Sequence, residues 1–172
     1  MFVLLDFLDQ GNDTFSITWF ELGETTVNWG MIFDPLTVVM LGLVSFVALL
    51  VQVYSVGYMS GQARFGWYFA AHSLFVTAML VLVLADNLIF LYAAWELVGL
   101  GSYLLIGFWY DRRPAAEAAK KAFVTTRIGD VGLLIGIILL YKATGTFEIS
   151  ALFHSVDAGL ESGLVSQTTV NV

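Results

Sequence analysis

The 172-residue sequence contains no cysteine, two histidines, two prolines and few charges, since only 12% of its residues are charged. Without cysteine there is no disulfide framework, no thiolate metal site, no iron–sulfur cluster and no c-type haem attachment. The two histidines, His72 and His154, lie far apart in the sequence and lack the spacing of metal ligands. We therefore expect neither a metal site nor redox catalysis in this chain.

The chain is rich in apolar residues instead. They make up 59% of the sequence, and its mean hydropathy is +0.84. A soluble domain of this composition would expose large apolar patches to water. A membrane span needs about 20 predominantly apolar residues, and four runs are long enough: 35–58, 67–85, 88–109 and 121–141. The sequence therefore predicts an all-α, polytopic membrane helix bundle.

The segments that flank the four runs are more polar. In 1–34, alternating residues around Phe15, Ile17 and Trp19 predict an outer loop with a possible β-hairpin. Asp34 and Pro35 form a good helix start, because an aspartate can cap the helix and proline suits its first turn. In 142–172 we expect an outer segment with a short amphipathic helix over 146–153, and a loop or tail from Ser155 onward.

The basic residues indicate how the bundle is oriented. Five of the seven border two loops on one side: Arg64, Arg112, Arg113, Lys120 and Lys121. Loops enriched in Lys and Arg stay in the cytoplasm, so both termini should be outside, on an acidic surface whose only base is Lys142. The net charge of −7 excludes a nucleic-acid footprint. We expect an integral protein of the bacterial plasma membrane rather than the mitochondrial inner membrane.

Three ionisable residues lie inside the predicted spans. Glu96 is deep in the third run, and Arg127 and Asp130 are three residues apart in the fourth, where their side chains can pair. An ionisable residue at the bilayer centre costs about 2.5–3.5 kcal/mol on insertion scales, so such residues usually mark an ion or proton path. The alternative is structural: a neutral, hydrogen-bonded Glu96 and an internal ion pair. For His72, helix packing is favoured over a relay role.

Four motifs, in one order and at matching intervals, give the chain a family resemblance. They are YSVGYM (54–59), VLADNL (83–88), WELVGL with SYLLIG (95–100 and 102–107), and KAF with TRIGD (121–123 and 126–130). Together they resemble the largest antiporter-like membrane subunit of respiratory complex I, the proton-translocating NADH:quinone oxidoreductase. The resemblance covers residues from about 30 to about 153.

The resemblance implies a function. Members of this family are bundles of some fourteen or more helices with two inverted repeats around broken helices. They belong to an oxidoreductase complex but hold no redox centre, so flavin, iron–sulfur clusters and quinone are expected in partner subunits. The resemblance assigns proton translocation to Glu96, Arg127 and Asp130, with Glu96 communicating with a lysine on a later helix. The expected partners are the lipid bilayer and other membrane and peripheral subunits of complex I.

Two other functions remain open on the sequence. The large subunit of multisubunit sodium/proton antiporters shares the glutamate motif around Glu96. A non-pumping structural membrane subunit would use the same charges for assembly alone. Because four spans cannot enclose a complete channel, the chain is expected to be part of a larger polypeptide and not to pump alone.

Overall fold

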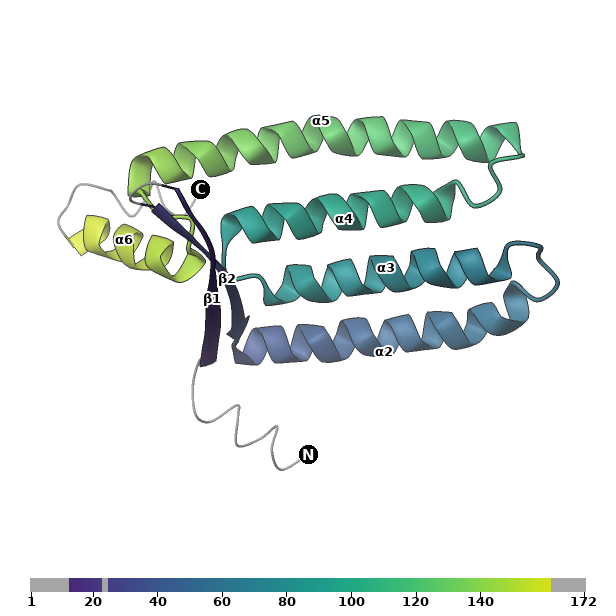
Figure 1. Ribbon diagram of the computed structural model, residues 1–172, viewed down its shortest axis with the longest axis horizontal. Coiled ribbons are helices and arrows are strands. Elements are labelled where there is room, and N and C mark those ends of the chain that lie inside the picture. Colours follow the sequence, from purple (N-terminus) through teal and green to yellow (C-terminus); the bar gives the residue numbers. More distant parts are fainter. Residues whose placement is uncertain (1–12, 23–24, 162–172) are drawn as a thin grey trace, which may run out of the picture.

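A computed structural model describes residues 13–22 and 25–161, with side chains over 30–156. Four helices long and apolar enough to cross a membrane lie side by side, confirming the predicted bundle (Figure 1). In chain order the elements are β1 (Asp13–Leu22), β2 (Thr25–Phe33), α2 (Pro35–Tyr58), α3 (Phe65–Leu84), α4 (Leu88–Ile106), α5 (Arg113–Thr144) and α6 (Ile149–Glu161).

The helix ends follow local capping chemistry. Asp34 precedes α2 as predicted, and its side chain accepts a hydrogen bond from the backbone N–H of Thr37, with Pro35 at the first helical position. This hydrogen bond stabilises the ionised carboxylate and lowers the pKa of Asp34 below its ordinary value of 3.8. Asn87 caps α4 through the N–H of Ile89, and Gly145 ends α5 with a left-handed φ of 75°.

Helix α5 is longer than the predicted span 121–141. It begins at Arg113, because Pro114 suits the first turn and the alanine-rich residues that follow are strong helix formers. Its 32 residues measure about 48 Å at ~1.5 Å per residue, which exceeds the roughly 30 Å hydrocarbon thickness. The charged first turns of α5 therefore extend beyond the apolar span, whereas α4 ends at Ile106, three residues before its predicted end.

Consecutive helices pack against each other, and α3 and α4 approach closely at a glycine. A Cβ on Gly101 of α4 would lie 3.0 Å from the Cβ of Phe75 on α3, so only glycine fits there without a shift. Large apolar side chains on α2 and α5 are exposed, among them Leu36, Phe46, Ile128 and Leu139. These faces are suited to lipid or to further membrane helices.

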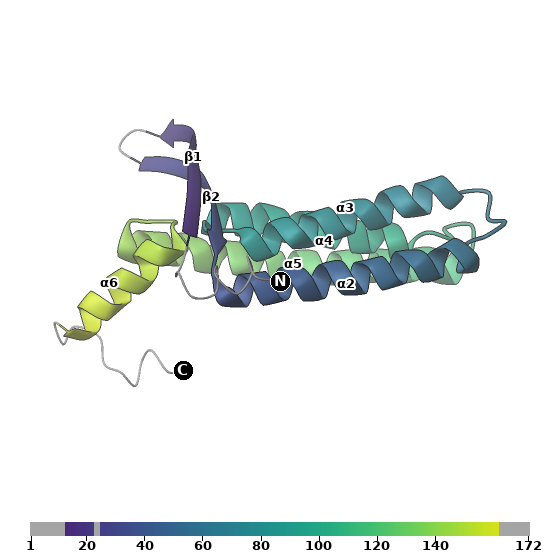
Figure 2. The ribbon, with the colours of Figure 1, turned by 90° about the horizontal axis from the view of Figure 1, so that it is seen from below.

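A β-hairpin and α6 lie at one end of the helix row, opposite the two loops that carry most of the basic residues (Figures 1 and 2). Strands β1 and β2 are antiparallel, with a register irregularity between Thr18 and Phe20. The prediction of a loop or tail from Ser155 was wrong as far as Glu161, where α6 ends. Apolar residues at 149, 152, 153 and 156 continue the helical period past Ser155.

The connections at this end are joined through the residues between α3 and α4. The N–H of Asp86 donates to the Gly30 carbonyl of β2 (3.3 Å), and the Asp86 carbonyl accepts from Ile149 (2.9 Å). The Asp86 side chain is buried, and its Oδ1 has no hydrogen-bond partner among the described residues. Burial, and then the nearby charge of Glu148, raise the pKa of Asp86 above 3.8.

Gly30 leaves room for this aspartate. A Cβ at Gly30 would lie 2.6 Å from Asp86 Oδ2 and 2.9 Å from Asp86 Cβ. We expect Gly30→Ala to separate β2 from the α3–α4 connection at a cost of about 1–3 kcal/mol, the usual range for overpacking. Amide hydrogen exchange in β2 of the full-length protein would measure the loss. Gly42→Ala is the control, because nothing lies within 4 Å of that position; equal protection in both variants would contradict the prediction.

Candidate functional site

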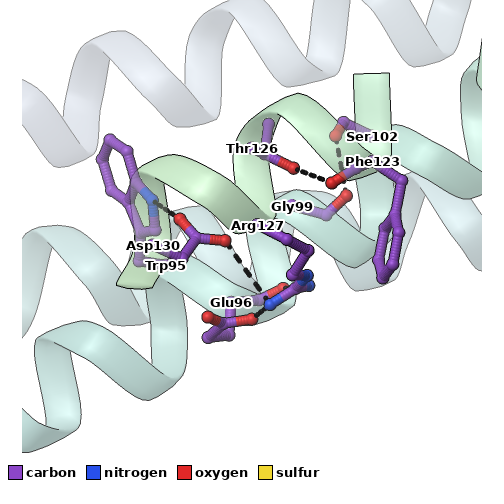
Figure 3. A network of polar contacts seen from close by, with 8 residues as sticks. All are labelled: Trp95, Glu96, Gly99, Ser102, Phe123, Thr126, Arg127 and Asp130. Carbon is purple, nitrogen blue, oxygen red and sulfur yellow. Dashed lines mark hydrogen bonds and ion pairs between the residues drawn. The ribbon is translucent and has the colours of Figure 1, made fainter. Parts of the chain in front are cut away.

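The three ionisable residues predicted from the sequence meet between two helices. Glu96 projects from α4 and Arg127 and Asp130 from α5, and Figure 3 shows contacts from the Arg127 guanidinium to both carboxylates. Residues 127 and 130 share a helix face because they are three positions apart. The packing of α4 against α5 turns that face towards Glu96.

Arg127 contacts both acidic residues. Its Nη1 forms an ion pair with Glu96 Oε2, and the same nitrogen lies 3.5 Å from Asp130 Oδ2. Its Nη2 donates to the backbone carbonyl of Glu96 over 3.4 Å. The arginine is therefore attached to α4 through both the side chain and the backbone of one residue, in addition to the predicted pairing within α5.

Asp130 is the most buried member of the cluster, with 4% of its surface exposed. Its Oδ1 accepts a hydrogen bond from the indole Nε1 of Trp95 over 3.0 Å, while Oδ2 faces Arg127. Each oxygen of this carboxylate thus has a different partner, a neutral hydrogen-bond donor at Oδ1 and a charged guanidinium at Oδ2. These two partners, one on each helix, fix the position of the carboxylate.

Two further residues lie against the arginine, and reasoning from charge alone missed both of them and Trp95. The guanidinium carbon lies 4.7 Å from the ring centroid of Phe123, one turn earlier on α5, in a cation–π contact. Gly99 of α4 leaves space beside the guanidinium, since an added Cβ would be 3.7 Å from Nη2. The four-residue spacing of Phe123 and Arg127 could have indicated that contact. The Trp95 contact depends on how α4 is rotated against α5.

The cluster has an imbalance of charge. Glu96 is eight residues into α4, roughly 12 Å from its start, too deep for a short side chain to reach the interface. One arginine faces two carboxylates, and Arg127 Nε is buried with no hydrogen-bond partner among the described residues. With both carboxylates ionised, the cluster carries one excess negative charge in a low-dielectric setting. It can reach neutrality by taking up a proton or by meeting another cation.

The histidines take no part in this cluster. His72 of α3 is buried, and its Nδ1 lies 3.4 Å from Nε2 of Gln52 on α2. About one turn away, the hydroxyl groups of Ser55 and Tyr68 form a hydrogen bond of 3.0 Å. These contacts join α2 to α3, as expected of a packing histidine. Within 13–22 and 25–161, no three His, Cys, Asp or Glu residues form a group that could hold a metal ion.

Two related family models match most of the chain. Residues 85–171 match the family described as NADH:quinone oxidoreductase/Mrp antiporter, transmembrane, and residues 19–69 match the N-terminus of complex I chain 5. The chain belongs to this family of antiporter-like membrane subunits. The first match includes all three members of the charge cluster.

Individual relatives define the likeness further. The chain is 45% identical over 159 residues to NAD(P)H-quinone oxidoreductase chain 5 of Synechocystis. The aligned region covers 91% of this chain and 23% of that protein. It is 58% identical over 119 residues to F(420)H(2) dehydrogenase subunit L of Methanosarcina mazei, covering 67% and 18%. A chain of the Mrp complex from Dietzia superposes with a TM-score of 0.74 at 28% identity, covering 87% and 16%. The chain thus spans about a fifth of its curated relatives.

Proposed function

We propose that this chain contributes a proton-handling site to the antiporter-like membrane subunit of a respiratory complex of the complex I type. The observation that supports it is the excess of one carboxylate over the single arginine in the cluster between α4 and α5. Such a cluster gains or loses a proton with a small change in the position of Arg127. Redox reactions elsewhere in the complex would drive that change.

The proposal assigns no cofactor to this chain. Flavin, iron–sulfur clusters and quinone would be held by partner subunits, and the chain would take part in an oxidoreductase reaction without transferring electrons. Relatives named for NAD(P)H-quinone oxidoreductase and for F(420)H(2) dehydrogenase are both similar to this chain. The electron donor would therefore be set by other subunits. Further membrane helices would cover the exposed faces of α2 and α5.

Sodium/proton antiport is the second candidate, and the superposition on a chain of the Mrp complex is the observation that favours it. The two functions differ in their driving force. The complete assembly, reconstituted in vesicles with a pH dye inside, should acidify or alkalinise the lumen when its electron donor and a quinone are supplied. Proton movement driven by a sodium gradient, with no response to donor and quinone, would refute the complex I function and support antiport.

We also propose the orientation in which the two basic loops are cytoplasmic. The structure places 59–64 and 107–112 at one end of the helix row and the hairpin and α6 at the other. A cysteine introduced at Ala115, which is half-buried in the first turn of α5, should resist an impermeant thiol reagent added outside intact cells. It should react once the membrane is opened. Labelling of Ala115→Cys from outside would reverse the assigned orientation.

A further inference from the structure

We propose that the end of the bundle formed by α3, α4 and the start of α5 holds a binding site for the headgroup of an anionic phospholipid. The site is a cavity of about 310 Å³, separate from the charge cluster around Arg127. Its lining includes Trp67 of α3, Tyr103 and Leu104 of α4, Tyr110, and Ala116 and Lys120 of α5. The proposal does not depend on proton translocation.

The lining has two chemically different parts. Leu104 and Ala116 offer apolar surface suited to the first segment of an acyl chain, while Lys120 supplies a cation. Trp67, Tyr103 and Tyr110 place aromatic rings with polar atoms beside them, as residues at a membrane interface do. An amphipathic ligand with an anionic head and an apolar tail satisfies both parts, whereas an ion in water satisfies only the lysine.

The charges around the cavity favour an anion. Residues 59–64 and 107–121 contain five basic and two acidic residues. An Asp111 oxygen lies 2.8 Å from an Arg64 nitrogen, and Glu117 Oε1 lies 3.4 Å from Lys120 Nζ, with both side chains of the second pair more than half exposed. Within the part of the chain that the structure describes, no carboxylate pairs with Arg112, Arg113 or Lys121. This end therefore has three positive charges in excess.

The position of the cavity also favours a lipid over a soluble phosphate. It lies where the apolar part of α5 gives way to the charged turns that begin at Arg113, the depth at which headgroups meet acyl chains. Arg64 keeps Tyr110 at the rim, since its guanidinium carbon lies 4.0 Å from the Tyr110 ring centroid. Basic pockets between membrane helices are established sites for anionic headgroups.

Native mass spectrometry of the full-length protein tests the site. The protein is titrated with phosphatidylglycerol and with phosphatidylcholine of the same acyl chains, and the ratio of the two affinities is measured. Lys120→Ala should lower the preference for phosphatidylglycerol about fivefold, the loss expected for one basic residue near a membrane surface. Lys120→Arg should retain it. Lys121→Ala is the matched control, because it removes the same charge one position away and outside the lining.

Further measurements distinguish a specific lipid site from diffuse surface charge and from a phosphate site. Ala116→Phe fills the cavity without changing any charge, so it should weaken the binding of both lipids. Equal loss in the Lys120 and Lys121 variants would show a diffuse surface charge and overturn the proposal. Displacement of the lipid by free glycerol phosphate at equal concentration would show that the cavity recognises a soluble phosphate instead. Absence of lipid binding in the wild type would overturn the proposal.

Discussion

Glu96→Gln in the full-length protein should reduce donor-driven proton transport several-fold while the complex still assembles. Glutamine keeps the size of the side chain and can still accept a hydrogen bond from Arg127, but it neither carries the negative charge nor releases a proton. Arg127 would then face only Asp130, and the excess negative charge that supports the proposed function would be gone. Transport is measured in vesicles with a pH dye, and assembly by native electrophoresis.

Glu117→Gln provides the matched control. Glu117 lies on the exposed first turns of α5 and pairs with Lys120 through side chains that are 52% and 67% exposed, so its neutralisation should leave transport unchanged. Glu96→Asp should reduce transport less than Glu96→Gln, because the charge remains and only retreats by one methylene. An assembled Glu96→Gln complex that transports protons at the wild-type rate would support a structural role for the charges.

The spans could be predicted because membrane insertion depends on a property that sequence displays directly. A helix that crosses lipid satisfies its backbone internally and needs only enough apolar length. Helix α2 therefore has the predicted bounds, with Asp34 as its cap. The start of α5 was missed because alanine, glutamate and lysine are good helix formers, while the charged residues among them lower the hydropathy. The hydropathy signal therefore stops at residue 121, whereas the hydrogen-bonded helix extends back to Arg113.

The C-terminal helix shows that amino-acid composition alone can predict the wrong secondary structure. Serine and glycine after residue 154 indicated a loop, yet the apolar period set by Ile149, Leu152 and Phe153 continues to Val156. In α6 this apolar periodicity outweighs the low helix propensity of serine and glycine. The junction next to it could not be predicted at all, because it depends on backbone hydrogen bonds between three segments far apart in sequence, at Gly30, Asp86 and Ile149.

For the charge cluster, sequence spacing predicts neighbours within one helix but not the partners across helices. The spacing of Arg127 and Asp130 predicted their proximity, and in the structure Arg127 Nη1 lies 3.5 Å from Asp130 Oδ2. The pairing of Arg127 with Glu96, and the hydrogen bond from Trp95 to Asp130, depend on the rotation of α4 against α5. Neither follows from a single sequence, since Trp95 and Glu96 are adjacent and point in directions about 100° apart on an ideal helix.

Arg127→Ala should have the largest effect on stability of any change in this cluster. It removes the one positive charge that faces two carboxylates, and it leaves Asp130 with Trp95 as its remaining donor. Loss of one partner of a buried ion pair costs about 3–5 kcal/mol, and the partly exposed side chains of Arg127 and Glu96 place the expected loss at the lower end of that range. Unfolding of the full-length protein in mixed detergent micelles would measure it.

A double-mutant cycle then assigns the lost free energy to its partner. The variant with Arg127→Ala and Glu96→Ala should be more stable than Arg127→Ala alone, because no unpaired Glu96 charge remains. The coupling with Glu96 should exceed the coupling with Asp130, since Asp130 has a second donor in Trp95. The exposed pair of Lys120 and Glu117 serves as the reference, with coupling of about 0.2–1 kcal/mol. If the Glu96 coupling does not exceed this reference, Arg127 is held by the Phe123 ring and the Glu96 carbonyl, and the Glu96 carboxylate needs a cation from another helix.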